Sequence, residues 1–90
     1  MNKKILLFIF LLINFLNGCF PPGLEEYEKS MESYNENRFI SAVEYFSRAI
    51  KSDSLKAEYY FQRANTYVIL GDIEKAFNDY KKSIEIDSTD

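Results

Sequence analysis

The fold is decided by residues 57–90, which read AEYYFQRANTYVILGDIEKAFNDYKKSIEIDSTD. Gly71 and Asp72 divide this stretch into two segments that each carry apolar residues at helical spacing. Glycine suits the left-handed residue that closes a helix, and aspartate suits the cap that opens the next one. The stretch therefore predicts a helix, a tight turn and a second helix.

An earlier part of the chain repeats the second of these helices. Residues 39–50 align without a gap on residues 73–84, at a spacing of 34 residues, and Asn37 and Arg38 form the break before them. Four pairs of small or apolar residues share positions: Ala42 with Ala76, Phe46 with Tyr80, Ala49 with Ser83, and Ile50 with Ile84. Repetition at this period is typical of stacked helical hairpins.

The later copy resembles the tetratricopeptide repeat. Its large and small signature positions are filled by Tyr60, Ala64, Tyr67, Gly71, Ala76 and Tyr80. Arg63 replaces the usual leucine, and we expect its stem to lie on apolar surface with its charged head in water. The resemblance implies an all-α fold of two antiparallel hairpins, about residues 24–56 and 57–90, that form a fragment of an α-solenoid after a cleaved signal segment.

The first helix of the earlier copy departs from the family pattern. Polar residues stand at several positions where the family has apolar or small ones: Glu26, Lys29, Ser30 and Ser33. An apolar stripe at helical spacing remains, made of Leu24, Tyr27, Met31 and Tyr34. We therefore expect a helix that packs either in the register of the repeat or on a face rotated toward this stripe.

The beginning of the chain has the pattern of a secretory signal. Lys3 and Lys4 precede an apolar run over residues 5–13, which is followed by Asn14, Phe15 and Leu16. This run is shorter than the roughly 20 apolar residues that span a bilayer. We expect residues 1–18 to be a signal peptide that is removed on export, with an uncleaved signal anchor as the alternative.

The segment Leu16-Asn17-Gly18-Cys19 resembles the bacterial lipobox. The resemblance implies cleavage before Cys19, diacylglycerol on its thiol and an acyl group, such as palmitate, on the new amino terminus. Residues 19–23 would then be a lipidated tether to the cell membrane or the outer membrane, with the chain facing the periplasm or the exterior. The alternative is an ordinary signal peptide with a cysteine nearby. Cys19 is the only cysteine, which excludes an intrachain disulfide.

Composition argues against several classes of function. The chain has no histidine, the commonest general base and metal ligand. Lys3 and Lys4 account for two of its 11 basic residues, so the part after residue 18 has nine basic and 14 acidic residues and a net charge of −5. These basic residues are scattered among acidic ones, which does not suit nucleic acid. We therefore expect that the chain is not an enzyme and that it binds no cofactor, metal or nucleic acid.

A binding function follows from the predicted architecture, because stacked hairpins present a concave surface to partners. By position in the family, the resemblance implies a peptide-binding groove lined by Tyr27, Met31, Tyr34, Phe61, Asn65 and Val68. The alternative for the first three is a place in the core. Tyr27 and Phe61 stand where chaperone-binding members would use a lysine, which argues against a clamp for a terminal carboxylate.

The last helix predicts an association face. Its apolar stripe is wider than one neighbouring helix covers, so Phe77 and Ile84, with an edge of Tyr80, are expected to face water. Such a face suits self-association, a partner protein or further repeats. We expect a lipid-anchored interaction or assembly module of the bacterial envelope. The alternatives are a truncated or split piece of a longer repeat lipoprotein without independent function, and a lipoprotein that binds glycan or peptidoglycan.

Overall fold

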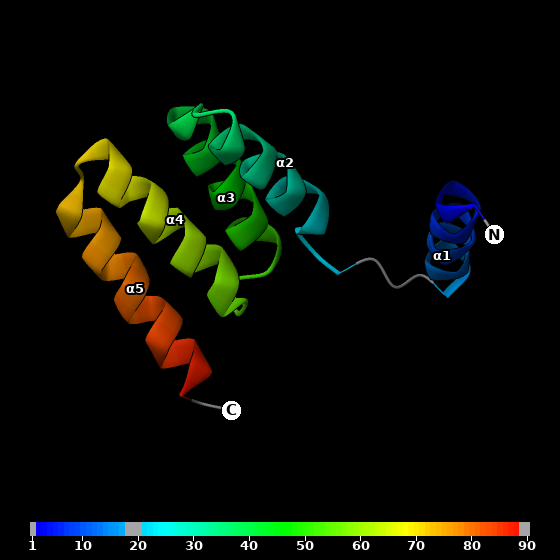
Figure 1. Ribbon diagram of the computed structural model, residues 1–90. Coiled ribbons are helices and arrows are strands. Elements are labelled where there is room, and N and C mark those ends of the chain that lie inside the picture. The colour runs from blue at the N-terminus through cyan, green and yellow to red at the C-terminus, as the bar shows by residue number, and fades with distance from the viewer. Residues whose placement is uncertain (1, 18–20, 89–90) are drawn as a thin grey trace.

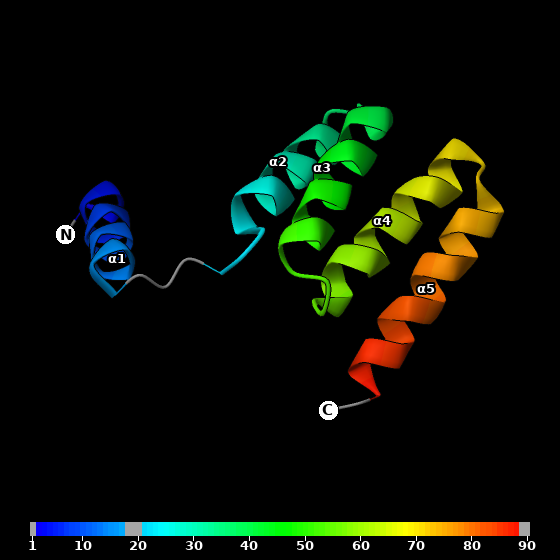
Figure 2. The same ribbon diagram turned by 180° about the vertical axis from the view of Figure 1, so that it is seen from behind.

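The computed structural model describes residues 2–17 and 21–88, and within these ranges it contains five helices and no strand. They are α1 (Lys3–Asn17), α2 (Leu24–Asn35), α3 (Phe39–Ser52), α4 (Ala57–Leu70) and α5 (Ile73–Asp87). Helices α2 to α5 pack against one another in chain order as two antiparallel hairpins (Figures 1 and 2). This confirms the expected all-α fold of two helical hairpins.

Helix α1 holds the apolar run of the predicted signal segment. Its large side chains at residues 5–12 are all exposed, with exposed fractions between 38% and 65%. Within the described residues, no helix is both long and apolar enough to cross a membrane. Cys19 and its neighbours Gly18 and Phe20 lie outside the described residues, so lipid attachment at Cys19 stays a prediction.

The turns of both hairpins use the same hydrogen bond. In the second hairpin Gly71 has a φ of 82°, and the backbone N–H of Asp72 donates to the carbonyl of Tyr67 at 2.9 Å. In the first hairpin Asn37 has a φ of 63°, and the equivalent N–H, that of Arg38, donates to a carbonyl at 2.8 Å. Asparagine tolerates the left-handed region better than most residues. Both predicted breaks are thus confirmed.

Helix α2 packs in the register of the repeat. Its buried residues are Ser30 and Ser33, and Ser30 is the residue that corresponds to Ala64 at a spacing of 34. The hydroxyl of Ser30 donates to the carbonyl of Glu26 at 2.8 Å, so its burial leaves no unpaired polar group. A rotated packing face for α2 is therefore wrong. The small side chain of Ser30, whose hydroxyl is bonded within its own helix, takes the place of the usual alanine where two helices are in contact.

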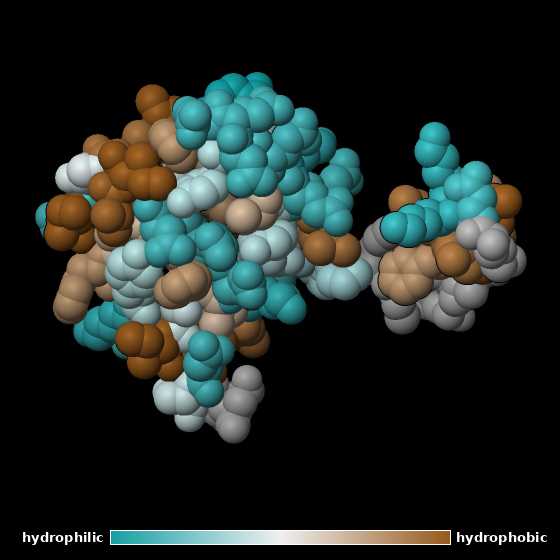
Figure 3. Space-filling view, in the orientation of Figure 1, coloured by the Kyte–Doolittle hydropathy of each residue, from teal (hydrophilic) through white to brown (hydrophobic). Residues whose placement is uncertain are grey.

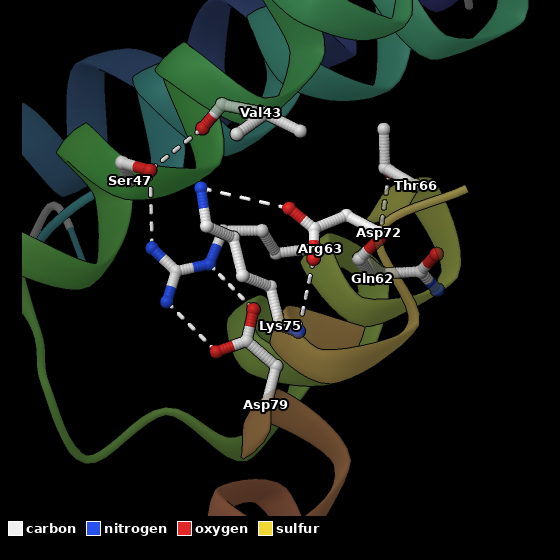
Figure 4. Close-up of polar contacts among 8 residues, drawn as sticks. All are labelled: Val43, Ser47, Gln62, Arg63, Thr66, Asp72, Lys75 and Asp79. Atoms are coloured by element: carbon white, nitrogen blue, oxygen red, sulfur yellow. Dashed lines mark hydrogen bonds and ion pairs between the residues drawn. The ribbon is translucent and has the colours of Figure 1, made fainter. Parts of the chain in front are cut away.

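A buried ion pair joins the two helices of the second hairpin, and its arginine also bonds to the first hairpin. The guanidinium of Arg63 on α4 donates to both carboxylate oxygens of Asp79 on α5, at 2.7 and 2.8 Å, and to the Oγ of Ser47 on α3 at 3.0 Å (Figure 4). The two charged side chains are only 19% and 8% exposed. The expectation that the head of Arg63 lies in water is wrong, because a carboxylate on α5 completes its hydrogen bonding inside the fold.

The aromatic rings around Arg63 fix its position further. The guanidinium carbon lies 5.9 Å from the ring centre of Tyr60 and 5.8 Å from that of Tyr67. Burial by itself lowers the pKa of Arg63, but the hydrogen bonds and charge of Asp79 outweigh it and raise the pKa above its ordinary value. Arg63 is therefore a permanent cation that ties α4 to both α3 and α5.

Candidate interaction surfaces

Tyr27, the first residue predicted for the groove, packs between the first hairpin and α4. Its ring centre lies 5.9 Å from that of Phe46 on α3 and 5.2 Å from that of Tyr59 on α4. Its hydroxyl donates to the Oε1 of Glu58 at 2.9 Å. Burial, followed by this hydrogen bond, raises the pKa of Tyr27 to about 12. Tyr27 is half-buried between the hairpins, so it offers only part of its ring to a ligand.

The remaining candidates differ in exposure. On α2, Met31 and Tyr34 are half-buried, and Tyr34 packs edge-on against Phe39 at 5.5 Å between ring centres. On α4, Phe61 and Val68 are each 45% exposed. The part of the predicted groove that is accessible to a partner is therefore supplied mainly by α4.

Phe61 and Asn65 make their contacts with α5. The ring centre of Phe61 lies 5.7 Å from that of Tyr80, in an edge-on arrangement. The hydroxyl of Tyr80 donates to the Oδ1 of Asn65, whose Nδ2 donates in turn to the Oε1 of Gln62 at 3.5 Å. Two residues predicted for the groove and one predicted for the association face thus form a single polar and aromatic group.

A cavity of about 480 Å³ opens beside this group, between the beginning of α4 and the end of α5. We call it the open cavity. Its lining includes Ala57, Phe61, Ser83 and Asp87. Its size falls within the range of about 300 to 1,000 Å³ that is usual for ligand pockets.

The outer side of α5 carries the exposed apolar residues that the sequence predicts. Phe77 and Ile84 are 65% and 68% exposed, while Tyr80 is half-buried. Lys81, also exposed, lies between them at helical spacing. Figure 3 shows more apolar surface gathered over the turn between α4 and α5, where the exposed residues are Val68, Ile69, Leu70 and Ile73. The exposed positions of Phe77 and Ile84 are confirmed.

Sequence reasoning missed several residues that join one helix to another. Tyr59 and Glu58 meet Tyr27, yet the internal repeat gives no sign of Tyr59, since Glu25 occupies its position in the first copy. Asp79 did leave a signal, because it lies three residues after buried Ala76 and therefore on the same helix face.

Comparison with known proteins identifies the second hairpin. The family model of the tetratricopeptide repeat matches residues 57–90. Residues 57–90 form a tetratricopeptide repeat. This repeat begins where α4 begins, and it contains Phe61, Asn65, Val68 and the whole outer side of α5.

Most of the chain is also similar to segments of longer known proteins. Identity is 32% over 65 residues with the Hsp70-Hsp90 organizing protein of Triticum aestivum and 34% over 67 residues with Hsp70-Hsp90 organizing protein 2 of Arabidopsis thaliana. It is 37% over 70 residues with the DnaJ homolog subfamily C member 7 homolog of Schizosaccharomyces pombe. The alignments cover 72% to 74% of this chain but 11% to 15% of these relatives. Because the tetratricopeptide repeat is a protein-interaction unit, the similarity supports protein binding rather than catalysis.

Proposed function

We propose that this chain is a lipid-anchored interaction module of the bacterial cell envelope, which binds a protein or peptide partner through its two hairpins. The tetratricopeptide repeat at residues 57–90 supports the binding role. The position of Cys19, at the end of the apolar segment and just before the hairpins, supports the anchor. Two or three acyl chains hold a protein stably, because each buried methylene contributes about 0.8 kcal/mol and a single chain binds only marginally.

The anchor is tested by replacing the lipid acceptor. Cys19→Ser is expected to move the chain from the detergent phase to the aqueous phase and to remove the lipid mass from the mature amino terminus. Asn17→Ser is the control, because it changes the same segment but keeps the cysteine. Unchanged partitioning of Cys19→Ser, with no lipid on the parent chain, would contradict the anchor and leave the repeat untouched.

The groove favours an apolar or amphipathic peptide segment. Phe61 and Val68 supply accessible apolar surface, and aromatic side chains give large contact area at low entropic cost. A partner's terminal carboxylate is disfavoured, because Tyr27 holds the carboxylate of Glu58 at this surface. The ligand is therefore unlike the acidic chain ends held by a carboxylate clamp.

Partner binding is tested by cross-linking the full chain in membranes and identifying what it captures. Val68→Glu places a charge on the accessible part of the groove and is expected to abolish capture of the specific partner. Ile40→Glu is a matched control, since Ile40 is an exposed apolar residue at the start of α3. Equal capture by the two variants would contradict a binding site on α4.

A further inference from the structure

The two hairpins carry equivalent ring pairs. Tyr27 and Phe46 in the first hairpin correspond, at a spacing of 34 residues, to Phe61 and Tyr80 in the second. The ring centres are 5.9 Å apart in the first pair and 5.7 Å in the second, with interplanar angles of 55° and 61°. Helix α4 covers the first pair, whereas Phe61 of the second pair lines the open cavity. The packing of α4 on the first ring pair is therefore a template for a helix that packs on the second ring pair.

Tyr59 is the side chain by which α4 enters the first hairpin. It is 2% exposed, its ring stacks on Tyr27 at 5.2 Å, and its hydroxyl donates to the carbonyl of Pro22 at 3.0 Å. Gly23 lies so close that a side-chain carbon there would be 3.0 Å from the ring. Burial raises the pKa of the Tyr59 hydroxyl, and the negative charge of Asp53 raises this pKa further.

We call the site that holds the Tyr59 ring in the first hairpin the socket. The open cavity lies at the equivalent place in the second hairpin. Gly23 and Tyr27, which lie against Tyr59, and Asp53, whose charge acts on its hydroxyl, correspond to Ala57, Phe61 and Asp87 at a spacing of 34 residues. All three of the latter residues line the open cavity. The second hairpin therefore presents a similar aromatic floor and a similar acidic rim, without a ring in the socket. It differs in having the methyl group of Ala57 at the position where Gly23 lies against the Tyr59 ring.

A charge difference specifies what the second socket accepts. In the first interface Arg63, four residues after Tyr59, donates to Ser47 at 3.0 Å. The residue that corresponds to Ser47 in the second hairpin is Lys81, which is exposed. A helix seated as α4 is seated would bring the residue four positions after its aromatic side chain onto Lys81. A carboxylate would be attracted there, and an arginine would be repelled.

We propose that the open face of the second hairpin, made of Phe61, Phe77, Lys81 and Ile84, binds an amphipathic helix of a partner protein. The helix carries an aromatic residue, which fills the open cavity, and Asp or Glu four residues later, which pairs with Lys81. It lies on α5 and α4 as α4 lies on α3 and α2. This face is distinct from the concave groove except at Phe61, and the proposal does not depend on the lipid anchor.

The 90 residues printed here contain no helix that fits this description. None of their aromatic residues is followed four positions later by an acidic residue. The outward side of α2, which would face the socket in a head-to-tail pair, has Glu25 at the position of Tyr59 and Lys29 at that of Arg63. These two form an exposed ion pair at 3.3 Å. A second copy would thus bring a carboxylate to the aromatic socket and a lysine to Lys81.

The test uses two synthetic helices with the sequence of α4, residues 57–70, each stabilised by a side-chain lactam and checked for helicity. One keeps the natural sequence and the other carries Arg63→Glu. Binding to the full chain in lipid nanodiscs is followed by fluorescence anisotropy, with empty nanodiscs as the blank. The Arg63→Glu helix is expected to bind about threefold or more tightly than the natural one. A further Tyr59→Ala change in that helix is expected to weaken binding about tenfold or more.

Variants of the full chain locate the site. Lys81→Glu is expected to reverse the preference between the two helices, and Phe77→Glu is expected to abolish binding of both. Ile40→Glu, a matched change at an apolar residue of similar exposure on α3, is expected to leave binding unchanged. Absence of binding by the helical Arg63→Glu peptide, or binding that Lys81→Glu and Phe77→Glu leave unaltered, overturns the proposal. Sedimentation of the parent chain as a dimer that Phe77→Glu dissociates overturns it as well, because the occupant is then a second copy.

Discussion

Asp79→Asn is expected to destabilise the hairpins strongly, because it leaves the guanidinium of Arg63 inside the fold without its counter-charge. Removal of one partner from a buried ion pair costs about 3 to 5 kcal/mol. Arg63 is 19% exposed and keeps its hydrogen bond to Ser47, so the lower part of this range applies. We expect a loss of about 3 kcal/mol, which for a domain of this size lowers the unfolding midpoint by about 12 to 24 °C.

The double change Arg63→Met and Asp79→Leu separates the cost of an unpaired charge from the worth of the pair. Apolar side chains of similar length in place of a buried ion pair are often neutral or stabilising. The double variant is therefore expected to unfold within about 1 kcal/mol of the parent chain. Urea unfolding of the full chain in detergent micelles, followed by near-ultraviolet circular dichroism, measures all three proteins.

Two results would refute this reasoning. One is an Asp79→Asn variant that loses less than about 0.5 kcal/mol, which is the size of an ordinary surface change. The other is a double variant that loses as much as Asp79→Asn. Either would show that the charge of Arg63 is well solvated in the folded chain.

Three further predictions concern single positions. Gly23→Ala is expected to lower the free energy of unfolding in urea more than Gly71→Ala does. Both glycines have a φ of 82°, which costs roughly 1 to 2 kcal/mol for alanine. Only at Gly23 would the new carbon also lie 2.7 Å from a backbone oxygen of α3. Ala76→Leu overpacks a residue that is 2% exposed and should cost about 1 to 3 kcal/mol, and an unmoved thermal midpoint would contradict the helix contact assigned there. Because the pKa of Tyr27 rises from 10.0 in the unfolded chain to about 12 in the folded one, its contribution to stability should be complete below pH 10 and vanish as the pH rises to about 12. Ultraviolet titration of tyrosinate should show this high pKa in the parent chain, lower in Glu58→Gln and absent in Tyr27→Phe.

The hairpins could be predicted from the sequence because their signals are local. Gly71 and Asp72 fix a turn through backbone conformation and one capping bond, and neither depends on distant residues. The internal repeat then placed the second helix of the first hairpin. The packing of α2 was left open because serine is polar in sequence, whereas Ser30 satisfies its own hydroxyl within the helix and packs as a small residue.

The interaction surfaces were harder to predict, because they depend on pairs of residues from different helices. Taken alone, Arg63 suggests a guanidinium in water. Its burial becomes favourable only because Asp79 on α5 accepts two hydrogen bonds from it. Phe61 was placed correctly on α4, but its contact with Tyr80 depends on how the two helices cross. Helical periodicity identifies the face that a residue shares, while its partner follows from tertiary packing.

The two ends of the hairpin stack are chemically different, and this difference gives the molecule a direction. The outward side of α2 carries the exposed ion pair of Glu25 and Lys29, which is stable in water. The outward side of α5 exposes Phe77 and Ile84, and each such side chain gains about 1.5 to 3 kcal/mol when it is fully buried. A helix docked there would also stabilise the repeat, by about 2.7 kcal/mol at a concentration 100 times its dissociation constant. Binding at this end and folding of the second hairpin would therefore be coupled, so a partner helix would raise the unfolding midpoint of the chain, and Phe77→Glu would remove that increase.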